Sequence, residues 1–176
     1  MSDIIRPLTT SDTSAFKNLR LASLSQDPAS WLATNEEEIS QPDYYFSNKI
    51  SYANTPPLFG YWGVFEDDKL VAYAQIASSF WHKKRHIATL YDVCVSTADR
   101  RKGLGSKLID FIIQKAKLSG FIEQILLWVT SQNSDAISFY ESLGFKKIAT
   151  TPESVKEKDG SYQDEHLYVI NLKYVN

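Results

Sequence analysis

Residues 100–106 read Arg100-Arg101-Lys102-Gly103-Leu104-Gly105-Ser106. This basic, glycine-containing stretch follows an apolar segment at residues 89–95, Thr89-Leu90-Tyr91-Asp92-Val93-Cys94-Val95, and precedes an amphipathic pattern. Glycine lets the backbone approach a ligand closely, and the first N–H groups of a helix, at the positive end of its dipole, favour an anion. A strand, a glycine turn and a helix in this order therefore predict a binding site for a phosphate or pyrophosphate.

Two familiar nucleotide motifs do not fit this stretch. The spacing Gly103-x-Gly105 lacks the third glycine of the dinucleotide fingerprint, and no Gly-Lys-Ser/Thr ending matches the P-loop. Taken alone, the stretch is equally compatible with an ordinary helix that begins after a basic surface loop. Its interpretation depends on the residues that accompany it.

Length and charge limit the class of protein. A chain of 176 residues, 43% of them apolar, can bury one sizeable core, and we expect a single domain over residues 1–176. The 19 Lys and Arg residues are outnumbered by 21 Asp and Glu residues, for a net charge of −2. Without an overall positive field, a nucleic-acid partner is not expected.

Cysteine and histidine usage favours a reducing compartment without a metal site. Cys94 is the sole cysteine, which excludes an internal disulfide and a cysteine-based zinc cluster. The histidines His82, His86 and His166 lack metal-ligand spacing. The N-terminus has no signal-peptide pattern and the apolar runs are too short to span a membrane, so we expect a cytoplasmic protein without a membrane partner.

Periodicity predicts alternating strands and helices. A helix should follow cap candidates at residues 10–12 and continue to about Leu24, and a capping box at residues 34–37 should start another, interrupted by Pro42. Residues 125–129 should form a strand parallel to 87–95, because a strand–helix–strand order forms a right-handed crossover. The expected strands are 4–8, 61–65, 70–76, 87–95, 125–129, 145–149 and 167–172; further helices are expected near 44–50, 104–119 and 136–143.

These elements predict an α/β (α+β) fold with a mixed, mainly antiparallel sheet of six or seven strands flanked by helices. An acidic turn at residues 66–69 should join the first antiparallel hairpin. Residues 153–165 are polar and read as either a loop or the tip of a long hairpin.

Arg100-x-x-Gly103-x-Gly105 follows a central strand, and Asn133 precedes Phe139-Tyr140-Glu141-Ser142-Leu143-Gly144-Phe145. The combination of these motifs resembles the GNAT superfamily of acetyl-CoA-dependent N-acetyltransferases. Each motif is weak alone, but their order and spacing are specific. The resemblance covers roughly residues 60–172, and residues 5–8 also look like the first strand of the family.

The resemblance implies acetyl-CoA as the co-substrate. The pyrophosphate would lie on the backbone amides of residues 101–106, with Arg100, Arg101 and Lys102 supplying positive charge. The pantetheine arm would pair with backbone groups of Val93 and Val95, as an added strand does. By the same resemblance, Asn133 would bind the arm and Tyr140 would face the sulfur. The expected cofactor-binding residues are Val93, Cys94, Val95, Arg100, Arg101, Lys102, Gly103, Leu104, Gly105, Ser106, Asn133 and Tyr140.

Acetyl transfer to nitrogen needs an oxyanion donor, an acid and a base. We expect backbone N–H groups near Cys94 and Val95 to hold the oxyanion and Tyr140 to be the general acid; the alternative for Tyr140 is an aromatic residue packed on the sheet. Many relatives carry a glutamate where this chain has Thr89, which leaves Asp92 as the nearest candidate base. Asp92 could equally be held by backbone groups at a β-bulge.

Other residues have less specific readings. Cys94 is expected to be a small core residue, so direct transfer is preferred to an acetyl-cysteine intermediate. His86 could act as a remote base through water. Five aromatic residues and three glutamates lie in segments that form the acceptor-side wall of similar proteins. The aromatic rings could bind a cationic amine with the help of the acidic side chains, or could serve only as hydrophobic packing under a solvated helix face. The residues are Trp31, Tyr44, Tyr45, Phe80 and Trp81, with Glu36, Glu37 and Glu38.

The predicted activity is an N-acetyltransferase that modifies an amine of a small molecule by direct attack. The alternatives are a protein or peptide N-terminal or lysine acetyltransferase, and a non-catalytic acyl-CoA sensor. Tyr140 favours an enzyme over a sensor. The last strands and aromatic edges are candidate contacts for a homodimer.

Overall fold

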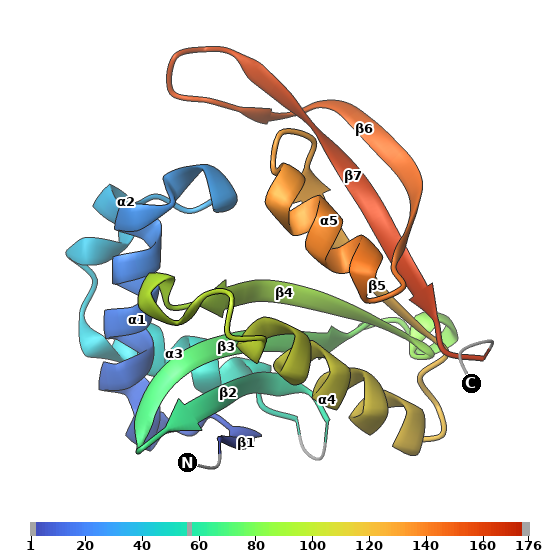
Figure 1. Cartoon of the computed structure of the whole chain (residues 1–176), viewed down its shortest axis with the longest axis horizontal. Helices are drawn as coiled ribbons and strands as arrows, with labels where there is room; N and C mark the ends of the chain where they lie inside the picture. The colour runs from blue at the N-terminus through green and yellow to red at the C-terminus, as the bar shows by residue number, and fades with distance from the viewer. Residues whose placement is uncertain (1–2, 56–57, 174–176) are drawn as a thin grey trace.

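The computed structural model describes residues 3–55 and 58–173 and contains one seven-stranded sheet with five α-helices (Figure 1). The predicted domain, residues 1–176, also includes residues 1–2, 56–57 and 174–176, which lie outside the described part. The strands are β1 Ile4–Pro7, β2 Gly60–Glu66, β3 Lys69–Ser78, β4 Ile87–Val95, β5 Gln124–Thr130, β6 Lys146–Lys156 and β7 Tyr162–Asn171. The helices are α1 Thr13–Gln26, α2 Asn35–Ile39, α3 Asp43–Ala53, α4 Leu104–Leu118 and α5 Ser134–Ser142.

The sheet has the strand order β1-β2-β3-β4-β5-β7-β6, and only the pair β4–β5 is parallel. Helix α4 provides the crossover between these two strands, as the strand–helix–strand pattern predicts. The mixed, mainly antiparallel sheet predicted from the sequence is therefore confirmed.

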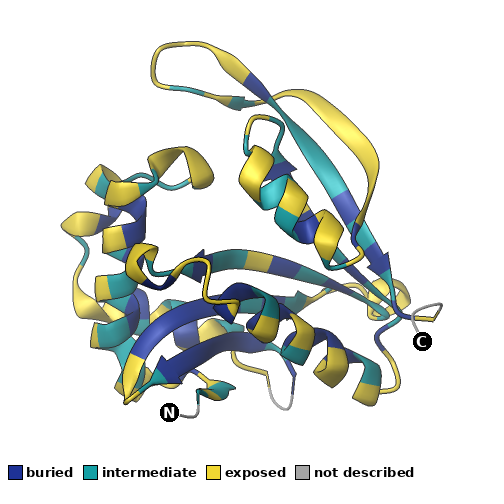
Figure 2. Ribbon diagram, in the orientation of Figure 1, coloured by how far each residue is buried: buried dark blue, intermediate teal, exposed yellow. Residues whose placement is uncertain are grey.

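Each face of the first four strands carries its own core. On one face, α4 packs its apolar stripe of Leu108, Ile109 and Ile112 against residues such as Val64 and Ala74. On the other face, α1 and α3 bury Phe16 and Phe46 against the rings of Tyr61 and Tyr73. Figure 2 shows β2 and β3 buried almost throughout, because helices cover both of their faces.

Local signals placed several boundaries correctly. Thr34 caps α2, accepting a hydrogen bond from the backbone N–H of Glu37, and Pro42 separates α2 from α3. Asp67 and Asp68 both adopt positive φ in the two-residue turn between β2 and β3, the conformation that a tight hairpin requires.

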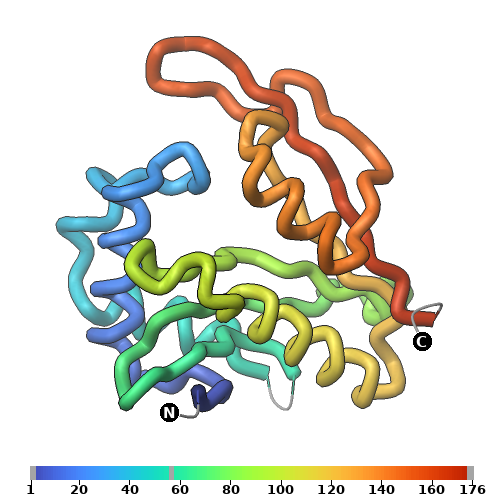
Figure 3. The backbone as a smooth tube through the Cα atoms, viewed as in Figure 1, coloured from blue at the N-terminus to red at the C-terminus, as the bar shows by residue number. Residues whose placement is uncertain are grey.

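The C-terminal hairpin is longer than the predicted strands. Residues 153–156 belong to β6 and 162–165 to β7, so the hairpin alternative for residues 153–165 is the one that the structure adopts. The polar composition reflects exposure, since nearly every residue of β6 is exposed. The backbone tube shows this arm rising beyond α5, away from β4 (Figure 3). None of the helices in the described part has the length and apolar composition needed to cross a membrane.

Candidate functional site

A cleft of about 1400 Å³ opens where β4 and β5 separate. The two strands pair only through Ile87, Ala88 and Thr89 of β4, so the β5-facing edge of β4 beyond Thr89 has no β5 partner. The cleft is lined by Val93, Cys94 and Val95 on β4, and by residues of β5, α5 and the start of α4. A segment with its own backbone N–H and C=O groups can therefore lie between the strands and satisfy the edge of β4.

The N-terminus of α4 forms one end of this cleft. Gly103 adopts φ +79° immediately before the helix, and Arg101 adopts φ +65°. The first hydrogen bond of the helix runs from the N–H of Lys107 to the carbonyl of Gly103, which leaves the N–H groups of residues 104–106 without intrahelical partners. Arg101, Gly103, Leu104, Gly105 and Ser106 all line the cleft. Backbone donors without intrahelical partners therefore lie at the cleft where the sequence predicts an anion site.

Gly105 is required by packing rather than by its backbone angles. A Cβ atom at this position would lie 3.3 Å from Cζ of Phe139 and 3.4 Å from Cγ2 of Val95. The absence of a side chain at Gly105 therefore lets the first turn of α4 pack closely against Val95 of β4 and Phe139 of α5. The glycine therefore brings the helix N-terminus close to the separated strand edge.

The three basic residues of the turn have different surroundings. The Arg100 guanidinium donates hydrogen bonds to Asp27 at 2.9 Å and to the carbonyl of Val95 at 3.4 Å. The Lys102 ammonium is 2.6 Å from Asp99, and Lys102 is not among the residues that line the cleft. Arg101 lines the cleft and has no ion-pair partner among residues 3–55 and 58–173. The structure thus brings Arg100 and Arg101, but not Lys102, to the predicted site.

Tyr140 and Asn133 face the cleft from α5. The Tyr140 side chain is 9% exposed, and its hydroxyl has no hydrogen-bond partner within the described part of the chain. Burial raises the pKa of this phenol above its usual value, which keeps the hydroxyl protonated. Asn133 caps α5: its Oδ1 accepts from the N–H of Ala136, and its Nδ2 donates to Ser30 Oγ at 3.1 Å.

Asp92 lies at a β-bulge and is held by side chains. Tyr73 pairs with Cys94 and Gln75 with Tyr91, so two residues of β4 oppose one of β3, and Asp92 adopts φ +50°. Oδ2 of Asp92 accepts from the Tyr61 hydroxyl at 2.6 Å and from the Arg20 guanidinium at 3.2 Å. The predicted bulge is present, but side chains rather than backbone groups hold the carboxylate. Oδ1 of Asp92 has no partner within the described residues.

Arg20 is itself fixed by a buried ion pair with Glu38. The guanidinium donates from Nε and Nη2 to the two oxygens of Glu38 at 2.5 and 2.7 Å, and both side chains are 3% exposed. Burial alone would raise the pKa of Glu38, but the hydrogen bonds and charge of Arg20 outweigh it and lower that pKa. Tyr45 donates to the same carboxylate at 3.3 Å. Helices α1 and α2 are thereby joined to the bulge of β4.

Several residues predicted for the acceptor side lie elsewhere. Trp31 lines the cleft and donates from Nε1 to Ser23 Oγ, whereas Tyr44, Phe80 and Trp81 are largely exposed and line neither the cleft nor a smaller cavity beside it. Cys94 is buried, as expected of a core residue, and burial raises the pKa of its thiol. No histidine lines either cavity. Within residues 3–55 and 58–173, no cluster of His, Cys, Asp and Glu side chains could hold a metal ion.

Arg20 and Tyr61 were missed in the sequence interpretation. Arg20 lies four residues after Phe16 and four before Leu24, which places it on the buried face of α1. A charged residue at such a position signals a buried partner, because an unpaired buried charge is costly. Tyr61 carries no comparable signal, because an aromatic residue in a buried strand usually serves packing.

Comparison with known proteins identifies relatives of this arrangement. The model of the acetyltransferase (GNAT) family matches residues 21–145. A ribosomal protein bS18-alanine N-acetyltransferase of Salmonella typhimurium is 28% identical over 131 residues, covering 73% of this chain and 80% of that protein. Shorter matches to N-acetyltransferases of Arabidopsis thaliana and Methanocaldococcus jannaschii span only 20% and 28% of those proteins.

Solved structures share the fold over nearly the whole chain. An acetyltransferase of the GNAT family from Streptococcus pneumoniae superposes with a TM-score of 0.84 at 20% identity, covering 97% of this chain and 99% of that one. A Salmonella typhimurium structure determined with its cofactor acetyl-CoA has a TM-score of 0.76 at 19% identity, covering 100% and 97%. The predicted family and fold class are both confirmed.

The buried pair makes a prediction about stability. Because Arg20 lowers the pKa of Glu38, the stability that this carboxylate contributes is fully present above its ordinary pKa of 4.5 and is lost as pH falls through the lower folded value. Glu38→Gln should therefore lower the free energy of unfolding by about 3 kcal/mol at pH 7, the order expected for a broken buried pair. The difference from the wild type should shrink below pH 4.5 in urea titrations.

Glu36→Gln is the matched control, because Glu36 is exposed and its ion pair is with the exposed Lys158. We expect no measurable change in its urea midpoint at either pH. Equal effects of the two substitutions would contradict a buried role for Glu38.

Proposed function

The chain belongs to the acetyltransferase (GNAT) family, and we propose that it transfers the acetyl group of acetyl-CoA to an amine of a small molecule by direct attack. The observation that carries this proposal is the cleft between the separated strands, with unpaired helix amides at one end and Tyr140 along its wall. The sequence prediction of acetyl-CoA as co-substrate agrees with the chemistry of these residues. We keep the cytoplasm as the proposed location, because the sole cysteine is a buried thiol.

The residues of the cleft fit coenzyme A without a metal. The N–H groups of residues 104–106 and the Arg101 guanidinium would hold the pyrophosphate, and the unpaired edge of β4 would bind the amides of the pantetheine arm. Bound there, acetyl-CoA supplies an activated acetyl thioester. The side chain of Asn133 is committed to capping α5 and to Ser30, so its expected contact with the arm would require it to exchange partners.

Asp92 and Tyr140 are proposed to handle the protons. An amine attacks only when neutral, and its pKa of about 10 means that a base must take its proton. Oδ1 of Asp92 has no partner within the described residues and can accept that proton, while Arg20 and Tyr61 fix Oδ2. As the N–C bond forms and the C–S bond breaks, Tyr140 would donate its phenolic proton to the departing sulfur. The new amide nitrogen would release its surplus proton to solvent, from which Tyr140 would be reprotonated. Backbone N–H groups near Cys94 and Val95 remain the proposed oxyanion donors.

Acylation of a protein N-terminus is the second candidate. The ribosomal protein bS18-alanine N-acetyltransferase aligns with 73% of this chain, which favours a peptide acceptor. A non-catalytic sensor would need the cleft but not the proton donor, so the presence of Tyr140 in the lining of the cleft supports an enzyme instead.

Acetyl-CoA should raise the melting temperature of the protein, because a ligand that binds only the folded state stabilises it. Arg101→Ala should weaken acetyl-CoA binding more than Lys102→Ala does, since Arg101 lines the cleft, whereas Lys102 does not line it and is already paired with Asp99. Titration calorimetry measures both affinities. No thermal shift at saturating acetyl-CoA would refute the cofactor assignment.

Tyr140→Phe should lower kcat by about 100-fold, the low end of the range for a general acid, with little change in acetyl-CoA affinity. Thiol release measures turnover. Tyr168→Phe is the matched control: it removes another buried tyrosine hydroxyl, which bonds Glu141 at 3.0 Å outside the cleft. Unchanged turnover in Tyr140→Phe would remove this residue as the acid.

Asp92→Asn should also lower kcat by about 100-fold near neutral pH, because the amide can still accept from Tyr61 and Arg20 but cannot take a proton. The deficit should shrink as the pH approaches the amine pKa of about 10, where the acceptor is already neutral. A pH–rate profile parallel to that of the wild type would show that Asp92 is not the base.

A further inference from the structure

A second cavity of about 430 Å³ lies on the face of the sheet that α1 and α3 cover. Its walls include Lys49 of α3, Tyr61 of β2, Gln75 of β3 and Asp92 of β4. The volume is within the range of small-molecule pockets, roughly 300–1000 Å³. Such a cavity can hold a compact molecule, whereas a peptide requires an extended groove.

Asp92 is the residue that the lining of this cavity shares with the lining of the larger cleft. The bulge at φ +50° turns its carboxylate toward Tyr61, between the two spaces. A molecule in the smaller cavity can therefore present an amino group to Asp92 on the path toward the larger cleft. The cavity has the position that an acceptor pocket needs.

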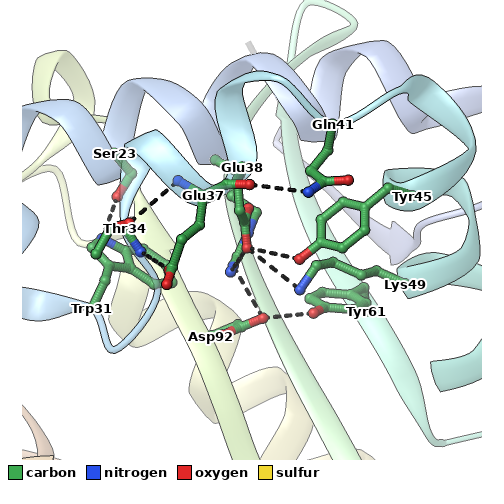
Figure 4. Close-up of polar contacts among 11 residues, drawn as sticks. Ser23, Trp31, Thr34, Glu37, Glu38, Gln41, Tyr45, Lys49, Tyr61 and Asp92 are labelled. Carbon is green, nitrogen blue, oxygen red and sulfur yellow. Dashed lines mark hydrogen bonds and ion pairs between the residues drawn. The ribbon is translucent and has the colours of Figure 1, made fainter.

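Lys49 gives the same cavity a positive group. Its ammonium forms an ion pair with Glu38 at 3.6 Å, longer than a hydrogen bond, and lies 4.9 Å from the centroid of the Tyr45 ring. Both oxygens of Glu38 already accept shorter hydrogen bonds from Arg20 at 2.5 and 2.7 Å. Lys49 makes no hydrogen bond among residues 3–55 and 58–173, although an ammonium has three donors. Figure 4 shows the ends of Lys49, Tyr61 and Asp92 gathered together. A positive and a negative group therefore line the same small cavity.

Resting on the proposed transferase function, we infer that this cavity is the acceptor pocket and that it selects amino-carboxylates. Asp92 receives the amino group, and Lys49 binds the carboxylate of the same molecule. Gln75 adds a neutral donor and acceptor to the wall. The presence of both Asp92 and Lys49 in the cavity favours an amino acid over a polyamine, because a polyamine would place a second positive charge beside Lys49.

The test compares the twenty common L-amino acids, their carboxamides, putrescine and spermidine as acceptors, with thiol release from acetyl-CoA as the readout. We expect at least one amino acid to be used with a kcat/KM about tenfold or more above that of its carboxamide, the discrimination expected of one charge-assisted hydrogen bond. Lys49→Met should remove this preference for the amino acid over its carboxamide, and Lys49→Arg should retain it. In the presence of coenzyme A, the preferred amino acid should raise the melting temperature of the wild type but not of Lys49→Met.

Lys83→Met is the control, because Lys83 is exposed and lines neither cavity. Its acid-to-carboxamide ratio should equal that of the wild type. The pocket assignment is overturned if carboxamides or polyamines are used as well as the acids, if only N-terminal amines of peptides are used, if no acceptor is used, or if Lys49→Met keeps the ratio. In each of these cases a thermal shift with acetyl-CoA would leave the cofactor assignment intact, whereas its absence would count against the proposed function itself.

Discussion

The separation of β4 from β5 is the constraint on which the site depends. Two neighbouring strands in a sheet normally pair along their length, because an unpaired backbone edge is costly when buried and invites foreign strands when exposed. Here the pairing stops after three residues of β4, and the crossover helix α4 begins beside the unpaired edge. The same departure from regular pairing creates a cleft, exposes backbone donors along it and places a helix N-terminus at its end.

The bulge at Asp92 is a second departure, and it requires support from other elements. An aspartate at positive φ is an uncommon conformation that costs of order 1 kcal/mol or more, and its carboxylate is only partly exposed. Tyr61 and Arg20 hold this carboxylate, and Glu38 holds Arg20 in turn. A buried ion pair of this kind is weak evidence for net stability, because the cost of removing two charges from water is large. Its geometric effect is clearer: it fixes the position of Asp92 relative to both cavities.

The sequence predicted the elements that local chemistry determines. Capping at Thr34, the interruption at Pro42, the acidic turn at Asp67 and the glycine turn before α4 each depend on residues within a few positions of one another. The family resemblance added the donor side, where we propose that backbone groups do most of the binding. Lys102 was placed in the site because its charge is visible in the sequence, but its pairing with Asp99 is a matter of side-chain direction that the sequence does not show.

The proposed acceptor side was harder to predict, because its residues meet only through the fold. Arg20, Glu38, Lys49 and Asp92 come from α1, α2, α3 and β4, and the hydrogen bond between Arg20 and Asp92 joins residues 72 positions apart. In the sequence, these residues appear as an arginine on a helix, part of an acidic run, a surface lysine and an aspartate in a strand. Each of them has an ordinary structural explanation when it is considered alone. A site that binds the donor through backbone amides needs only the right backbone shape. A site that binds the acceptor through side chains can change its specificity with single substitutions at positions far apart in the sequence. The fold therefore constrains the donor more tightly than the acceptor, and the acceptor must be inferred from the charges that the folded chain brings together.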